Sequence, residues 1–349
     1  MNSDPSPRRL PAEWEAQSGV QLTWPHESTD WGPNLASVEP VFAAIGAAIA
    51  RRESLLVVCR DTDHRTHVLE QLRAAGTDLD RVQLGIALSD DTWARDHGAI
   101  TVLEDGQPIL LDFVFNGWGG KFPAEQDNQL TASLAAQGRF GTTPVEAADL
   151  VLEGGSIESD GAGTLLTTRH CLMQPTRNPD LSQTEIEERF RQHFGAERVL
   201  WLEHGALEGD DTDGHIDTLA RFCDPSTIAY VECSDPEDSQ FPGLERMAAE
   251  IAALVQVSGE PYRQVPLPLP APQLDEGRRL PATYANFLII NEAVLVPVYG
   301  DPADAIAMER LGAVFPGRNV VGIDCREIIR QGGSLHCLTM QFPLGVLPH

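Results

Sequence analysis

The chain has 349 residues, and its 52 acidic residues outnumber its 25 basic residues, which gives a formal net charge of -27 at pH 7. This charge repels the phosphates of nucleic acids and of anionic membranes, and it attracts small cations. The N-terminal segment has no apolar run of signal-peptide length, and polar residues and a proline interrupt the longest apolar stretch, 287–298. We therefore expect a soluble cytoplasmic protein with no nucleic-acid or membrane partner.

The N-terminal part of the chain alternates apolar runs with amphipathic segments. This pattern predicts a strand over 20–24, a helix over 38–50, a strand over 55–59 and a helix over 64–75. A weaker helical stretch follows near 130–137.

Further along the chain, a unit of short apolar strands, a loop, a helix and a final strand recurs three times. The helix centres lie about 55 to 60 residues apart, which is the size of one supersecondary unit. Four to five such units predict a single domain over 1–349, and the strand pairs before the helices argue against a doubly wound sheet. The predicted elements are strands 164–168 and 171–174, a helix capped by Ser182 and strand 199–201; strand 228–231, helix 243–255 and a strand around Val265; and strands 285–291 and 293–298, helix 302–311 and strand 320–323.

Four segments with glycines or dense acidic residues beside reactive side chains fall at similar places in these units. Glycine at such points permits tight turns and close approach of a ligand to the backbone. A radial arrangement of the units would bring the four segments together. They are 90–96 (DDTWARD), 152–157 (LEGGSI), 214–217 (GHID) and 332–337 (GGSLHC).

Hydrolysis of a guanidinium group needs the residue types that these segments supply. The cation is planar and delocalised, so paired carboxylates must hold it, and Asp96 and Asp217 are candidates for this fork. Cys337 is the candidate nucleophile, because a thiolate attacks far better than a hydroxyl and the bound cation itself would favour the thiolate. His215, supported by Glu153, can protonate departing ammonia and then activate water.

Each of these residues has a simpler interpretation when it is taken alone. Cys337 would be a buried structural thiol, Asp96 an ion-paired strand end and Glu153 a turn cap. His215 and Asp217 would form a surface turn or half of a metal site. The prediction therefore depends on the set rather than on any single residue.

The sequence carries no signature of a metal or an organic cofactor. His215, Asp217, His336 and Cys337 include plausible zinc ligands, but their spacing matches no zinc motif. The six cysteines are scattered without paired CxxC spacing, so neither a disulfide scaffold nor a zinc knuckle is indicated. A GxSxG elbow and a phosphate-binding loop are also missing from the sequence. We therefore expect no metal and no cofactor.

Taken together and in this order, the motifs resemble those of the agmatine deiminase family and of its relatives, the bacterial-type peptidylarginine deiminases. Each motif is weak alone, but the set covers nearly the whole chain. The matching segments are LPAEW (10–14), WP (24–25), DxWxRD (91–96), FNGWGG (115–120), LEGGS (152–156), LTT (166–168), NP (178–179), GDDTDGHID (209–217), YxNF (284–287) and GGSLHC (332–337).

The resemblance implies a fold and a set of roles. The implied fold is the five-bladed α/β propeller of the guanidino-group-modifying (pentein) superfamily, with the active site on its pseudo-fivefold axis. The implied catalytic roles are attack by Cys337, proton transfer by His215, guanidinium binding by Asp96 and Asp217, and support of substrate and histidine by Glu153. The implied substrate-binding residues are Trp93, Asp90, Asp211 and Trp118.

The implied reaction passes through a covalent amidino-cysteine, releases ammonia and uses water to form a ureido product. For agmatine the product is N-carbamoylputrescine, on the route to putrescine. The expected partner is thus a small cationic guanidino substrate, and self-association into a homo-oligomer is compatible with the sequence.

The sequence departs from the family pattern at three places, of which the first two spare the proposed catalytic atoms and the third bears on the choice of substrate. Ser334 stands where the family usually has asparagine, and 97–99 (HGA) stands where it has Thr-Gly-Pro. Asp211 stands where a glutamate is expected near the amine of agmatine. Peptidyl-arginine or another guanidino compound therefore stays an alternative substrate, and a noncatalytic polyamine-binding protein is the alternative from another class.

Overall fold

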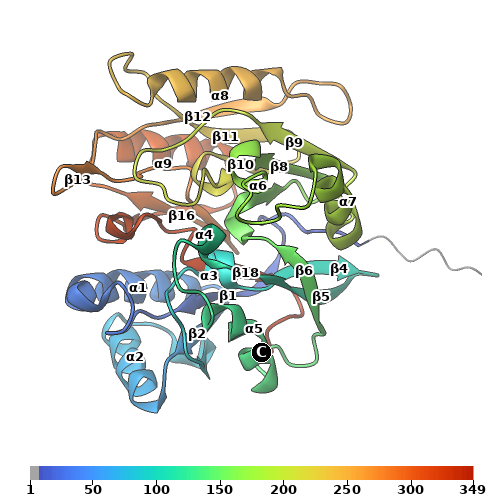
Figure 1. Cartoon of the computed structure of the whole chain (residues 1–349). Coiled ribbons are helices and arrows are strands. Elements are labelled where there is room, and N and C mark those ends of the chain that lie inside the picture. Colours follow the sequence, from blue (N-terminus) through green and yellow to red (C-terminus); the bar gives the residue numbers. More distant parts are fainter. Residues whose placement is uncertain (1–7, 349) are drawn as a thin grey trace, which may run out of the picture.

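The computed structural model describes residues 8–348, which form five mixed sheets that share one pattern of connections (Figure 1). In each sheet a first strand pairs antiparallel with a second, and the second pairs in parallel with a third. Helical segments join the two parallel strands, as a parallel crossover requires. The predicted mixed α/β fold with a repeated unit is confirmed. The expectations that concern residues 1–7 and 349 lie outside the described residues.

The first sheet joins the two ends of the chain, because the C-terminal strand pairs antiparallel with the first strand. Its strand order is β18-β1-β2-β3. Its elements are β1 (Gln17–Thr23), α1 (Leu35–Ala50), β2 (Ser54–Cys59), α2 (Thr62–Ala74), β3 (Val82–Ile86) and β18 (Thr339–Pro343).

The other four sheets follow in chain order, and each is described together with the helices that connect its strands. The second contains β4 (Ile100–Glu104), β5 (Gln107–Val114), α4 (Gly117–Gly120), α5 (Leu130–Ala136) and β6 (Val145–Val151). The third contains β7 (Ile157–Ser159), β8 (Thr164–Thr168), α6 (Arg169–Leu172), α7 (Gln183–Phe194) and β9 (Arg198–Leu202). The fourth contains β10 (Ala220–Asp224), β11 (Thr227–Glu232), α8 (Phe241–Ala253) and β12 (Arg263–Pro268). The fifth contains β15 (Leu288–Ile290), β16 (Ala293–Val298), α9 (Ala303–Val314) and β17 (Asn319–Asp324), and a small hairpin of β13 (Leu274–Asp275) and β14 (Arg278–Arg279) precedes it.

In the third sheet and its helices, the predicted start of α7 is confirmed and one predicted strand is wrong. Ser182 caps α7 as expected, in a capping box that Glu185 completes. The predicted strand 171–174 is wrong, because these residues lie in α6 and the turn after it. The hydroxyl of Thr168 accepts a hydrogen bond from the backbone N–H of Cys171, which starts a helix directly after β8. The antiparallel partner of β8 is therefore β7.

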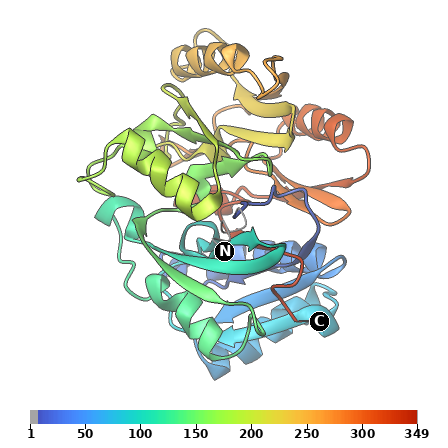
Figure 2. The ribbon, with the colours of Figure 1, turned by 90° about the vertical axis from the view of Figure 1, so that its right-hand side faces the viewer.

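One stretch, Gly32–Ala50, is long and apolar enough to cross a membrane by length and composition alone. More than half of it is buried, and α1 packs against α2, β1, β2 and β17. This is the environment of a core helix in a soluble protein. Figures 1 and 2 both show α1, α2, α7, α8 and α9 at the periphery of the molecule.

The fold brings together five short segments that each precede the first strand of one sheet. Contacts join α3 to the 3₁₀ turn η4, join η4 to η5, and join α3 to β18, and the backbone N–H of His336 donates to the carbonyl oxygen of Asn286. Four of these segments overlap those that the sequence predicted to converge. The segments are α3 (Ala94–His97), η4 (Gly154–Ser156), η5 (Ile216–Thr218), residues 283–287 and residues 332–338.

Candidate active site

A cavity of about 140 Å³ lies beside these segments. The structure brings five of the nine predicted site residues to its lining. Asp217, His215 and Glu153 are fully buried next to it, and Asp90 does not line it. The five lining residues are Trp93, Asp96, Trp118, Asp211 and Cys337.

Cys337 lies between a carboxylate and an amide. Its Sγ is 3.7 Å from Oδ2 of Asp217, and the side-chain N–H of Asn286 donates to Sγ at 3.2 Å. Burial raises the pKa of Cys337 well above its ordinary value, and the carboxylates of Asp217 and Asp96 raise it further. The sulfur is therefore a neutral thiol as long as no cation offsets these two carboxylates.

Asp96 is oriented by two donors from neighbouring segments. The indole N–H of Trp118 donates to Oδ2 at 2.9 Å, and the backbone N–H of Gly155 donates to Oδ1 at 3.0 Å. A Cβ at residue 155 would come within 2.6 Å of Nδ1 of His215 and 2.9 Å of Oδ1 of Asp96, so only glycine permits this approach. Burial raises the pKa of Asp96 to about 6, which still leaves it mostly ionised at neutral pH.

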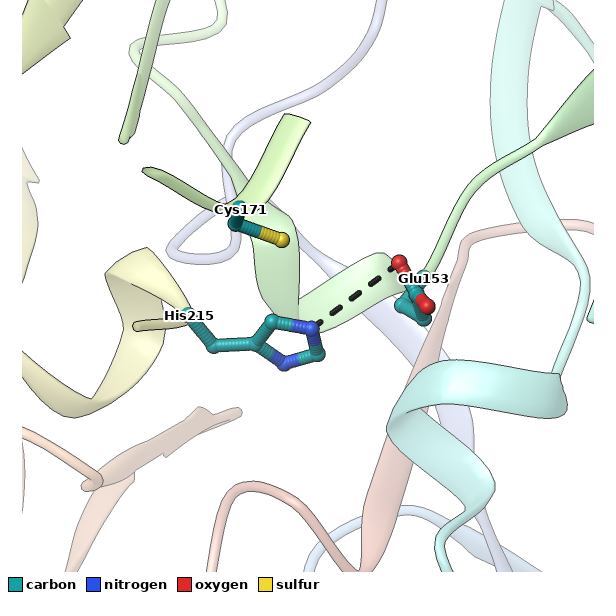
Figure 3. Close-up of side chains that lie close together, drawn as sticks. All are labelled: Glu153, Cys171 and His215. Carbon is teal, nitrogen blue, oxygen red and sulfur yellow. Dashed lines mark ion pairs between the residues drawn. The ribbon is translucent and has the colours of Figure 1, made fainter. Parts of the chain in front are cut away.

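His215 lies between two carboxylates without a hydrogen bond to either. Its Nδ1 is 3.6 Å from Oδ1 of Asp96 and its Nε2 is 3.9 Å from Oε2 of Glu153. Figure 3 shows the thiol of Cys171 and the carboxylate of Glu153 both near the ring of His215. Burial disfavours the charged ring, but Asp96, Cys171 and Glu153 together hold the pKa of His215 well above its ordinary value. The side chain is thus an imidazolium with both N–H groups free to donate.

Glu153 is held by a buried arginine. Nε of Arg177 lies 2.9 Å from both carboxylate oxygens of Glu153, and the guanidinium also donates to Oδ2 of Asp213 at 2.8 Å and to the carbonyl of Thr212 at 2.9 Å. Arg177 therefore ties Glu153 to the loop that carries His215.

The two tryptophans of the cavity are positioned by close backbone contacts. A Cβ at Gly333 would come within 2.3 Å of the ring of Trp93, so glycine is needed for the ring to pack there. Trp118 adopts φ 55°, a left-handed conformation that is uncommon outside glycine. Its indole N–H reaches Asp96 from this strained backbone.

The two remaining acidic candidates differ in position. Asp211 lines the cavity, and burial raises its pKa to about 6. Asp90 instead accepts a hydrogen bond from the backbone N–H of Gln126 at 2.7 Å, which stabilises a loop. Its neighbour Asp91 lines the cavity and accepts from the indole N–H of Trp93 at 3.0 Å. The structure thus brings Asp91, rather than Asp90, to the lining of the cavity.

One group in the described part of the chain has the composition of a metal site. Ligand atoms of Glu153, Cys171 and His215 lie within 4.8 Å of one another. Arg177 already binds both oxygens of Glu153, and burial raises the pKa of Cys171, which disfavours its thiolate. The three side chains are therefore better suited to hold a proton on His215 than a metal ion.

The sequence analysis assigned no role to several residues that support the site. Asn286 lies in the segment before β15. This segment is equivalent to those that carry Asp96, Glu153 and His215, so its place in the repeat could have indicated a site residue. His336 donates to Oδ2 of Asp217 from Nδ1 at 2.7 Å, although the sequence analysis considered it only as a metal ligand. Arg177 and Arg221 had no local signal, because their partners are distant in the sequence. Glu13 lies in the LPAEW motif, but nothing in the sequence indicates that it contacts His336.

Known proteins match this chain over almost all of its length. The family described as Porphyromonas-type peptidyl-arginine deiminase matches residues 9–343. Agmatine deiminase of Stutzerimonas stutzeri is 34% identical over 360 residues, which cover 96% of this chain and 95% of the relative. The structure of C. jejuni agmatine deiminase with substrate bound is 36% identical, with a TM-score of 0.90 and 98% of both chains covered. A Porphyromonas gingivalis structure, provisionally described as an arginine deiminase, is 50% identical, with a TM-score of 0.92 and coverage of 98% of this chain and 100% of its own.

Proposed function

The chain belongs to the Porphyromonas-type peptidyl-arginine deiminase family, and we propose that it hydrolyses agmatine to N-carbamoylputrescine and ammonia. One observation carries the proposal: a buried thiol, two buried carboxylates and an imidazolium lie together beside one small cavity. Relatives named agmatine deiminase, with or without bound substrate, support the choice of substrate. The substrate is thus a small guanidino cation, in keeping with the negative charge of the chain.

The carboxylates of Asp96 and Asp217 bind the guanidinium group. Oδ1 of Asp217 is buried and has no hydrogen-bond partner among the described residues, so it can accept from the substrate. Two carboxylates that accept charge-assisted hydrogen bonds fix the plane of the cation and expose its central carbon to Cys337.

Substrate binding ionises the nucleophile. The same two carboxylates raise the pKa of Cys337 in the free protein, and a bound cation offsets their charge. The thiol proton then leaves to solvent, and the thiolate bonds to the guanidinium carbon. His215 donates a proton to one amino group, and ammonia leaves an amidino-cysteine cation behind.

The second half of the reaction reverses these roles. His215, now neutral, takes a proton from a water molecule that attacks the same carbon. The tetrahedral adduct then expels the Cys337 thiolate, loses its remaining excess proton and releases the ureido product. Glu153 holds the ring of His215 in position through both steps, and Arg177 holds Glu153.

The proposal extends to the architecture and the setting. We propose that the five sheets are the blades of one propeller around the site, in a single cytoplasmic domain. Their shared strand pattern and the pairing of the chain ends in the first sheet support this arrangement. The acidic charge supports the expectation that nucleic acids and anionic membranes are not partners.

Incubation of the purified protein with agmatine, arginine and an arginyl peptide tests the substrate, with ureido product and ammonia as readouts. We expect product from agmatine in clear preference to the other two. Product from the peptide instead would replace agmatine by peptidyl-arginine, and no product from any substrate would contradict the deiminase assignment. A mass increase on Cys337 after a rapid acid quench distinguishes catalysis from mere polyamine binding.

A further inference from the structure

A buried network on the far side of Asp217 links this carboxylate to the N-terminal motif. Nδ1 of His336 lies 2.7 Å from Oδ2 of Asp217, and Nε2 lies 2.7 Å from Oε2 of Glu13. Glu13 belongs to the LPAEW motif, to which the proposed chemistry assigns no role. All three side chains are buried.

The geometry sets the number of protons in this network. A neutral imidazole has one N–H and can donate to only one of two carboxylates. Two contacts of 2.7 Å therefore require two protons on the three groups Glu13, His336 and Asp217. Burial and the guanidinium groups of Arg221 and Arg95 lower the pKa of His336 as a single site. The carboxylates of Glu13 and Asp217 oppose this lowering, and against the effect of burial Arg221 and His336 lower the pKa of Glu13 itself. The second proton therefore lies on Nε2 of His336, which donates to Glu13.

The surrounding charges fix Glu13 in place. Arg221 donates to Oε2 of Glu13 at 2.9 Å and to Oε2 of Glu158 at 2.7 Å, and the backbone N–H of Ile289 donates to Oε1 of Glu13 at 2.7 Å. Arg95 lies 3.6 Å from Oε2 of Glu13. With the second proton on His336, three carboxylates (Glu13, Asp217 and Glu158) face three cations (His336, Arg221 and Arg95), so the buried charges of the network balance.

As a result, the two carboxylate oxygens of Asp217 have different roles. Oδ2 is occupied by His336, and Oδ1 is left without a partner among the described residues. We propose that Glu13 is a positioning residue that acts through His336 to hold Asp217 with Oδ1 available to the guanidinium of the substrate. This inference rests on the proposed function, because it assigns Glu13 a part in the binding of that substrate.

Glu158 supplies the matched control. Glu13→Gln and Glu158→Gln each remove one carboxylate from Arg221, so both lower stability. Only Glu13→Gln removes the carboxylate that His336 contacts. Both oxygens of Glu13 face donors, Oε1 that of Ile289 and Oε2 those of Arg221 and His336, and an amide offers only one acceptor. We expect Glu13→Gln to lower kcat/KM and the affinity of the Cys337→Ala background for agmatine by roughly ten- to a hundredfold, the effect of a lost hydrogen bond to a charged group. Glu158→Gln leaves both quantities within about twofold. Equal effects of the two variants would overturn the proposal in favour of a structural role.

A double-mutant cycle and a spectroscopic measurement complete the test. His336→Asn keeps a side-chain N–H near Asp217 but cannot reach Glu13, so Glu13→Gln should cost no further activity in this background. Additive losses of activity would contradict the proposal that Glu13 acts through His336.

¹⁵N NMR of the ring of His336, assigned by the loss of its signals in His336→Asn, should show two protonated nitrogens at neutral pH in the free protein. One protonated nitrogen would refute the proton count even in a protein that turns over agmatine, whereas absence of turnover with two protonated nitrogens would refute only the proposed function.

Discussion

The two sides of Asp217 are equally buried but differ in how their polar atoms are satisfied. On the side of the cavity, Oδ1 of Asp217 and both ring nitrogens of His215 have no hydrogen-bond partner among the described residues. On the other side, both ring nitrogens of His336 contact carboxylates, and Arg221 donates to two carboxylates and a carbonyl.

In the proposed mechanism, the groups without a hydrogen-bond partner contact the substrate, and the groups with partners support them. A buried polar atom without a partner costs about 1 to 3 kcal/mol, so a protein keeps it where a ligand later supplies the partner. Burial alone does not distinguish the two sides. The comparison predicts that substitutions on the cavity side cost activity at little cost in stability, and that substitutions in the network cost stability.

Removal of the nucleophile should have the largest effect on activity. Cys337→Ala should lower kcat by roughly ten-thousandfold or more, because among the described residues no other thiol lines the cavity and could form the covalent intermediate. The thermal midpoint should stay within a few degrees of the parent. Cys59→Ala, which removes a buried thiol from β2, is the control and should lower the midpoint without changing kcat. Retained turnover in Cys337→Ala would remove Cys337 from its assigned role.

Disruption of the network should have the largest effect on stability. Arg221→Met leaves Glu13 and Glu158 without their buried cation, so the free energy of unfolding should fall by about 3 to 5 kcal/mol. Arg326→Met removes an exposed arginine that pairs with Asp324, and it should cost less than about 1 kcal/mol. Urea unfolding measures both. A loss below 1 kcal/mol for Arg221→Met would mean that the network contributes little to folding.

The same contrast explains what the sequence could and could not predict. Cys337, His215 and Asp96 could be found because a reactive side chain lies beside glycine or acidic residues at a repeated position in each unit. Asn286 occupies the equivalent position but has no ionisable group, so a search for reactive chemistry passes over it.

The network could not be found in this way. Glu13 and His336 are 323 residues apart, and their contact depends on the pairing of β1 with β18. No local pattern encodes such a contact. The wrong strand at 171–174 has a different, local cause, because one hydrogen bond from the backbone N–H of Cys171 to the hydroxyl of Thr168 overrides a β-like run of residues.

Substitution of Asp96 should abolish activity and increase the stability of the folded protein. Burial raises the pKa of Asp96 to about 6, above the value of about 3.9 in unfolded chains. The folded state therefore binds this proton more tightly, and the contribution of Asp96 to stability falls as pH rises from about 4 to about 6. Asp96→Asn should bind no agmatine, yet above pH 6 it should be more stable than the parent by up to about 3 kcal/mol.

Unfolding of Asp96→Asn and of the parent between pH 4 and 8 checks this sign. The stability difference should shrink toward zero as pH falls through about 4, because the parent carboxyl group is then protonated as well. Parallel stability curves for the two proteins would show that the charge of Asp96 does not oppose folding.

Substitution of Asp211 should have the smallest effect on activity. It tests whether residues of the cavity differ in the part of the substrate that they contact. Its carboxylate lines the cavity, and the family resemblance places this position near the amine of agmatine, so we expect it to contact the terminal ammonium of agmatine. Asp211→Asn should raise KM for agmatine about tenfold with little change in kcat, the loss of one charge-assisted hydrogen bond. A simple alkylguanidine without an amine is the matched control substrate, and its KM should not change. Because burial raises the pKa of Asp211 to about 6, the difference between the two substrates should be full above that pH and should fade below it. Equal losses for both substrates would place Asp211 among the supporting groups instead.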